Sequence, residues 1–134
     1  DTPGEEPGGY SYEELVRIAA DCVRHAGLGR TCMMPRFLQV LMRSNSDERR
    51  TFIDAAIAAD DLNAFHEMRE QGYLSDRYLL YGHKSRCELY TYMLKKEFGD
   101  HITVESIYEK EELDGLTVSG SIAVALKAIE QDTN

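Results

Sequence analysis

The chain has 134 residues, of which 43% are hydrophobic and 29% charged, a composition typical of one globular domain with a buried core. Its formal net charge of -9 argues against binding to nucleic acid or to an anionic membrane surface, since both need concentrated positive charge. No apolar run is long enough to span a membrane. The odd number of cysteines, three, favours a reducing compartment, and we expect an intracellular, cytoplasmic protein.

The N-terminal residues predict a tail followed by a capped helix. Residues 1–9 combine Pro, Gly and acidic residues without an apolar side chain, so we expect a flexible tail there. Ser11 and Glu14 have the spacing of a capping box, and Gly27 is expected to end the helix that follows. The buried face of this helix is predicted from apolar residues at three- and four-residue steps: Leu15, Ile18, Ala19, Cys22, Val23 and Ala26.

Two further features are predicted in the middle of the chain. After a connection at 27–34, Pro35 suits the first turn of a second helix. The buried face of that helix is expected to contain Phe37, Leu38, Leu41 and Met42. Residues 55–72 predict two short helices joined at Asp60 and Asp61. We expect three apolar residues to pack together across this link: Ile57, Leu62 and Phe65.

The stretch 55–72 resembles one ankyrin unit, in which a helix of small residues turns through a short polar link into a second helix ending at Gly. That family repeats its unit about every 33 residues, and the chain has neither this self-similarity nor the Thr-Pro-Leu-His start of the unit. A stacked repeat array is therefore the alternative, and the prediction is a hairpin that forms one corner of a helical bundle.

The C-terminal half is also predicted to be mostly helical. Helices are expected at 76–81, at 85–98, near 105–113 and around Val118, Ile122, Ala125 and Ile129, with a short extended piece at 102–104 and a turn at Asp114 and Gly115. Runs that alternate apolar and polar residues are nearly absent. The predicted fold is therefore all-α, a compact bundle of about six to seven short helices built from antiparallel helical hairpins, forming a single domain over 10–134.

The main functional signal is the crowding of tyrosines between Tyr73 and Tyr92, among many aliphatic residues. Tyrosine is favoured at interfaces because it combines a large apolar area with a polar tip. The sequence therefore predicts a non-enzymatic interaction, regulatory or adaptor domain without a cofactor, and a homo-oligomer is compatible with this role. The residues expected to bind a protein partner are Tyr78, Tyr81, Tyr90 and Tyr92. The alternative interpretation places these rings in the core.

A second hypothesis rests on cysteine and histidine. Two helical pairs have the spacing and chemistry of zinc ligands: Cys22 with His25, and His83 with Cys87. In the simpler interpretation, Cys22 is a small hydrophobic residue and His25 stabilises the end of its helix. Cys32 lies near Arg30, whose positive charge would favour a reactive thiolate. The alternative function is thus a small zinc-binding or thiol-dependent enzyme or ligand-binding bundle, and no catalytic residue is assigned.

Overall fold

The computed structural model of the chain describes residues 8–132, and most of the expected flexible tail, residues 1–7, lies outside them. Contacts divide the chain into two units, Asp1–Ser75 and Asp76–Asn134. The expected single domain over 10–134 stays a prediction, and each unit is described by itself below.

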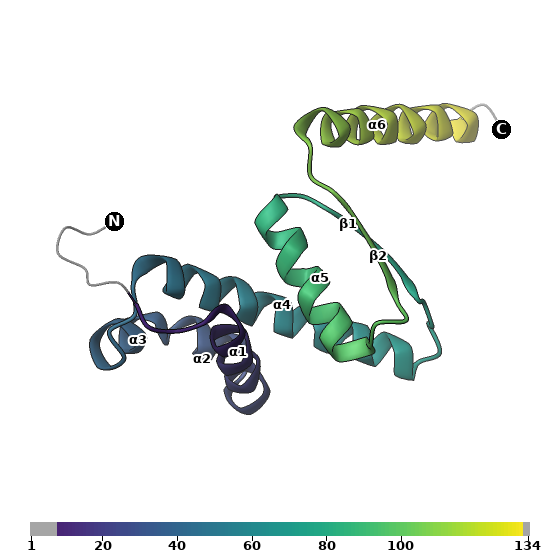
Figure 1. Cartoon of the computed structure of the whole chain (residues 1–134). Coiled ribbons are helices and arrows are strands. Elements are labelled where there is room, and N and C mark those ends of the chain that lie inside the picture. The colour runs from purple at the N-terminus through teal and green to yellow at the C-terminus, as the bar shows by residue number, and fades with distance from the viewer. Residues whose placement is uncertain (1–7, 133–134) are drawn as a thin grey trace. The chain divides into compact units, whose positions relative to one another are not determined.

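The described part of the first unit is helical (Figure 1). Its helices are α1 (Tyr12–Ala26), α2 (Leu28–Cys32), α3 (Pro35–Leu41) and α4 (Ser46–Glu70). The segment that we expected to be only a connection contains the short helix α2. The start of α3 is confirmed, because Pro35 occupies its first turn.

The capping box of α1 is confirmed. The Ser11 amide donates to the Glu14 carboxylate at 2.9 Å, and the Glu14 amide donates to the Ser11 hydroxyl at 3.2 Å. The hydrogen bond from the Ser11 amide holds the pKa of Glu14 below its usual value. Gly27 ends the helix with a φ of 81°, a backbone conformation that residues with a Cβ rarely adopt.

The predicted hairpin at 55–72 is wrong. A single helix, α4, runs from Ser46 to Glu70 and passes through Asp60 and Asp61 without a turn. The residues just before this pair are mainly alanines, which have the highest helix propensity, and the cost of aspartate inside a helix is small by comparison. One continuous helix therefore contains all three residues that were expected to pack across a link: Ile57, Leu62 and Phe65.

The core of the first unit lies where α1 packs against α4. α1 contributes Leu15, Val16, Ala19 and Val23, and the buried residues of α4 include Phe52, Ala55, Ala56, Ala58 and Ala59. Phe52 is completely buried. Only one side chain of the short helix α3, Leu38, is described as buried, so the predicted buried face is wrong for Phe37 and Met42, which are exposed.

Glu48 joins the start of α4 to the segment that leads into α1. Its carboxylate accepts hydrogen bonds from the amides of Asn45 and Tyr10, each at 2.9 Å, while the Asn45 side chain accepts from the Glu48 amide at 2.8 Å. A Cβ added to Gly8 would overlap the Glu48 carboxyl group, so the chain passes this group too closely for a larger residue. Among the residues that the structure describes, Glu48 is the only charged residue that is buried.

The second unit contains β1 (Arg77–Tyr81), α5 (Lys84–Phe98), β2 (Thr103–Ile107) and α6 (Lys110–Asp132). The two strands pair in parallel, with Arg77 opposite Thr103 and Tyr81 opposite Ile107. Strand, helix and parallel strand thus form a β-α-β unit, in which α5 makes the connection between the two strands (Figure 1). The end of α5 at Gly99, with a φ of 92°, is as predicted.

Several expectations for the second unit are wrong. The helix expected at 76–81 is strand β1, and residues 105–107 belong to β2 instead of a helix. The short extended piece expected at 102–104 is confirmed at 103–104, which belong to β2, while Ile102 lies just before the strand. The turn expected at Asp114 and Gly115 is absent, because α6 is continuous there. The described chain is mostly helical with a small parallel sheet, and not an all-α bundle of six to seven short helices.

The continuity of α4 can be tested at Asp60, an exposed residue in its interior. Proline at this position removes a helical hydrogen bond and clashes with the preceding turn, so Asp60→Pro should lower the free energy of unfolding by about 3 kcal/mol or more. The control Asp60→Ala should be neutral or slightly stabilising. Urea unfolding followed by circular dichroism measures both. Equal stability of the two variants would contradict a continuous helix.

Candidate functional site

The sheet of the second unit has one face covered by α5 and one face left open. Residues in a strand point alternately to the two faces, and β1 alternates between exposed and half-buried side chains along its length. On the covered face, the ring of Tyr78 stacks on Phe98 of α5, with centroids 6.1 Å apart and planes 9° from parallel. The open face carries Arg77, Leu79 and Tyr81.

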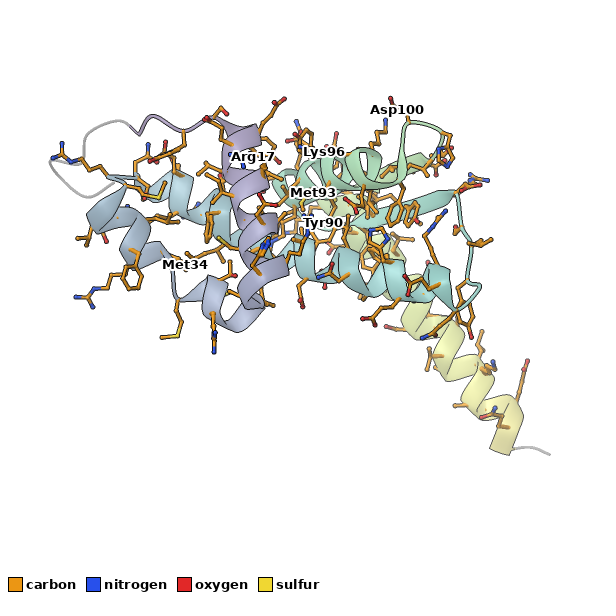
Figure 2. All side chains as sticks on the ribbon, turned by 90° about the horizontal axis from the view of Figure 1, so that it is seen from below. Arg17, Met34, Tyr90, Met93, Lys96 and Asp100 are labelled. Atoms are coloured by element: carbon orange, nitrogen blue, oxygen red, sulfur yellow. The ribbon has the colours of Figure 1, made fainter. Side chains whose placement is uncertain are left out.

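The four tyrosines predicted to bind a partner lie on two different elements. Tyr78 and Tyr81 belong to β1, where their odd separation places them on opposite faces of the sheet. Tyr81 is exposed over 74% of its surface, and Tyr78 is half-buried. Tyr90 and Tyr92 are both half-buried residues of α5, on which Figure 2 labels Tyr90.

Lys96 contacts both the ring and the hydroxyl of Tyr92. Its ammonium group lies 5.5 Å from the centroid of the Tyr92 ring and 3.5 Å from the Tyr92 hydroxyl. The two residues are one helical turn apart on α5, where Figure 2 labels Lys96. Tyr92 thus has a local partner for its ring and its hydroxyl, whereas no such partner is described for Tyr81.

The open face of the sheet combines apolar and charged groups. Leu79 is 57% exposed and lies beside Tyr81 on the same face. The Arg77 guanidinium forms an ion pair with the Glu105 carboxylate across the two strands, at 3.3 Å. Ile107, the register partner of Tyr81, is half-buried. We call Leu79, Tyr81 and Ile107, with the Arg77–Glu105 pair beside them, the open sheet face.

A pocket of about 280 Å³ lies where β1 passes into α5. Its lining is Leu80, Tyr81, Gly82, His83, Arg86, Cys87 and Tyr90. Gly82 allows the turn with a φ of 147° and donates its amide to the carbonyl oxygen of Ile107 at 3.1 Å. Basic side chains beside the first turn of a helix suit an acidic group better than a basic one. The sequence singled out four of the lining residues, Tyr81, His83, Cys87 and Tyr90, but not their grouping, which depends on the strand that precedes α5.

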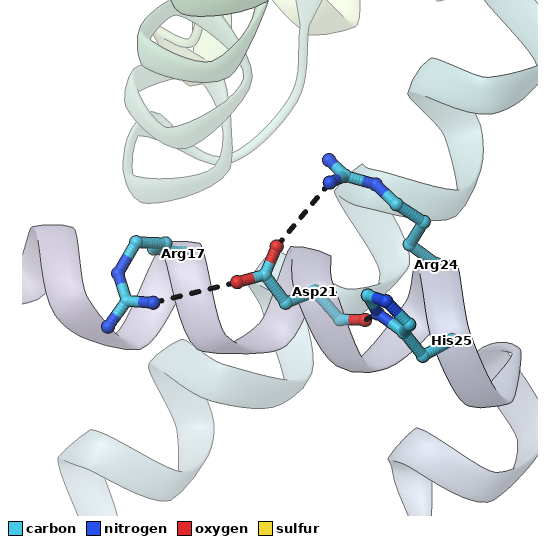
Figure 3. Close-up of polar contacts among 4 residues, drawn as sticks. All are labelled: Arg17, Asp21, Arg24 and His25. Carbon is cyan, nitrogen blue, oxygen red and sulfur yellow. Dashed lines mark hydrogen bonds and ion pairs between the residues drawn. The ribbon is translucent and has the colours of Figure 1, made fainter.

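The zinc hypothesis gains no support from the geometry. Within residues 8–132, no three side chains of His, Cys, Asp or Glu are grouped to hold a metal ion. Of the candidate zinc set, Cys22 and His25 belong to the first unit, and His83 and Cys87 belong to the second. Figure 3 shows the polar contacts of His25, whose Nδ1 lies 2.7 Å from the carbonyl oxygen of Asp21. His83 is the residue that precedes the first turn of α5. His25 therefore stabilises its own helix, as in the simpler interpretation.

The three thiols differ in their access to solvent. Cys32 is exposed, Cys22 is half-buried and Cys87 is buried. Burial raises the pKa of the Cys22 thiol, and the negative charge of Asp21 raises it further. The Asp21 carboxylate forms ion pairs with Arg17 at 3.5 Å and Arg24 at 3.6 Å (Figure 3). Cys22 is therefore a less reactive thiol than its exposure alone would indicate.

Comparison of the chain with models of protein families, with curated proteins and with solved structures finds no match. Among the described residues, no helix combines the length and the apolar character needed to cross a membrane.

The order of thiol reactivity is a direct test of these surroundings. In a short pulse of iodoacetamide on the native protein, we expect Cys32 to be modified first and Cys22 more slowly, because its raised pKa lowers its thiolate fraction. Cys87 should react only when the protein is unfolded. Mass spectrometry of the digested protein measures each site. Modification of Cys87 as fast as Cys32 under native conditions would contradict the burial of Cys87 on α5.

Proposed function

We propose that the chain is a non-enzymatic interaction domain that binds a protein partner through the part of its Tyr-rich segment that lies on the open sheet face, with Tyr81 as the central residue. The observation that supports this proposal is the pair of neighbouring exposed side chains, Leu79 and Tyr81, on the open sheet face. Parallel sheets are usually covered on both faces, because the helices that connect their strands lie on those faces. A partner that covers this second face would complete the arrangement.

The chemistry of the open sheet face suits recognition of a protein. Tyr81 offers a large, stiff ring whose hydroxyl stays hydrogen-bonded at the rim of an interface. Leu79 adds apolar area next to it, and the Arg77–Glu105 ion pair provides the charged border that interfaces commonly have. The exposed aromatic residue is the type that contributes most binding energy when it is buried in a partner's pocket.

The strand edges offer a second means of contact. Each of the two strands pairs only with the other within the described residues, so each has one edge without a sheet partner. Backbone groups at such an edge can bind an extended segment of another protein by strand addition. The alternating side chains of β1 would then select the partner, because Leu79 and Tyr81 point to the same side.

The test compares two matched pairs of residues. The double variant Leu79→Ala and Tyr81→Ala should weaken partner binding by at least about tenfold. It should leave the unfolding midpoint nearly unchanged, because both side chains are exposed. The control is Tyr73→Ala with Leu74→Ala, an equally exposed Tyr and Leu that lie outside β1. This control pair should bind like the unmodified chain.

The measurement has two steps. A partner is first captured from the native source with the unmodified chain, and each variant is then titrated with that purified partner. If no protein is retained, or if the two double variants lose binding equally, the open sheet face is not the recognition surface.

A further inference from the structure

The helix α6 has an apolar strip along one side. Val118, Ile122, Leu126 and Ile129 follow one another at steps of four and three residues, so they lie within about 80° of arc on an α-helix. Each of them is more than half exposed. Figure 2 shows the side chains of this helix, drawn in yellow, projecting from the ribbon. A strip of this size that is left in water is normally the contact surface of another helix.

Carboxylates border this strip on both sides. Relative to Ile122 at the centre, Glu112 and Glu130 lie about 80° to one side, and Asp114 lies about 80° to the other. The two lysines of α6, Lys110 and Lys127, lie more than about 100° away from the centre of the strip. The strip is therefore an apolar surface with negative borders, and it fits an apolar surface with positive borders.

The first unit contains a surface of that kind. Phe37 and Val40 lie three residues apart on α3, Met33 lies two residues before the helix begins, and each of the three is more than 60% exposed. Neighbouring residues at this spacing lie on one side of a helix. This is the face whose residue Phe37 was expected to be buried, and the single chain leaves it in water.

The charge of this segment is opposite to that of α6. Between Cys22 and Ser46 the sequence contains no Asp or Glu, although the whole chain has a net charge of -9. Three exposed arginines belong to this segment: Arg30 on α2, Arg36 on α3 and Arg43 just after the end of α3. Each of them is without an ion pair among residues 8–132. Complementary borders of this kind set the choice and the orientation of a partner.

We propose that the chain self-associates by docking the apolar strip of α6 from one copy onto the α3 face, Met33, Phe37 and Val40, of a second copy. The carboxylates beside the strip would then lie next to the arginines of that face. The contact joins two different surfaces, so a two-fold dimer contains it twice. Doubling the contact brings the buried area closer to the about 800 Å² per partner that stable interfaces bury. The residues involved are separate from those of the open sheet face.

The first experiment measures the molar mass of the full chain over a series of concentrations by sedimentation equilibrium. The unmodified chain should form a dimer. Ile122→Asp on α6 and Phe37→Asp on α3 should each raise the dissociation constant by at least about tenfold, because each places a charge inside the apolar contact. Circular dichroism checks the fold of both variants, and Arg36→Glu with Arg43→Glu replaces Phe37→Asp if that variant does not fold.

Val124→Asp is the matched control for α6. Val124 is 73% exposed and lies about 160° around the helix from Ile122, on the opposite side from the strip. The control should dimerise like the unmodified chain. If it loses the dimer as Ile122→Asp does, the strip is not the contact surface.

Mixing the two variants identifies which surfaces meet. The Ile122→Asp chain keeps an intact α3 face, and the Phe37→Asp chain keeps an intact α6 strip. A mixed dimer can therefore form one contact between two intact surfaces, so the equimolar mixture should associate more tightly than either variant alone. Pairing of α6 with α6, or of α3 with α3, predicts no such gain. The proposal is overturned by that result, and also by a monomeric unmodified chain, which would leave both faces to other proteins or to docking within one chain.

Discussion

The packing of α1 against α4 is the constraint on which the first unit depends. Four alanines are buried along α4, and side chains this short let a second helix approach closely. The close approach leaves little volume to fill, and one large ring, Phe52, fills what remains at the first turns of α4. α2 and α3 also contact α4, so one long helix serves as the support for every shorter helix of this unit.

Local signals predicted the helix ends well, because a capping residue acts on its own neighbours. The Ser11–Glu14 box, Pro35 and Gly99 lie where the sequence placed them. Whether the helix ends at Asp60 and Asp61 depends on how their preference compares with that of their neighbours, and a search for local end signals does not include this comparison. Two polar residues end a helix only if no stronger preference continues it, and the alanines before them have that preference.

The parallel strands are the part of the fold that the sequence indicated least. The partner of β1 lies beyond an entire helix, so no short window contains both strands. This error also changed the expected site. On a helix, residues three apart such as Tyr78 and Tyr81 are neighbours, but on a strand they point to opposite faces. One ring is therefore stacked on Phe98, and the other is exposed beside Leu79.

The Tyr-rich segment itself was visible in the composition, while the choice of its exposed members was not. Tyr90 and Tyr92 lie on different sides of α5, as helical periodicity predicts for two residues that are two positions apart, and both are half-buried. For the two apolar surfaces on α3 and α6, the sequence pattern predicts burial where the structure shows exposure. Their spacing is that of buried helix faces, and only the three-dimensional arrangement shows that the chain leaves both exposed.

Glu48 has a consequence for how the ends of two helices respond to change. One carboxylate both caps α4, through the Asn45 amide, and holds the chain before α1, through the Tyr10 amide. The two anchors are therefore thermodynamically coupled, and the energetic effects of disturbing them are not additive. A side chain introduced at Gly8 would push against the Glu48 carboxyl group and so affect the first turn of α4, although the two residues are 40 positions apart in the sequence. Strain at the start of the chain thus reaches the longest helix of the unit through a single side chain.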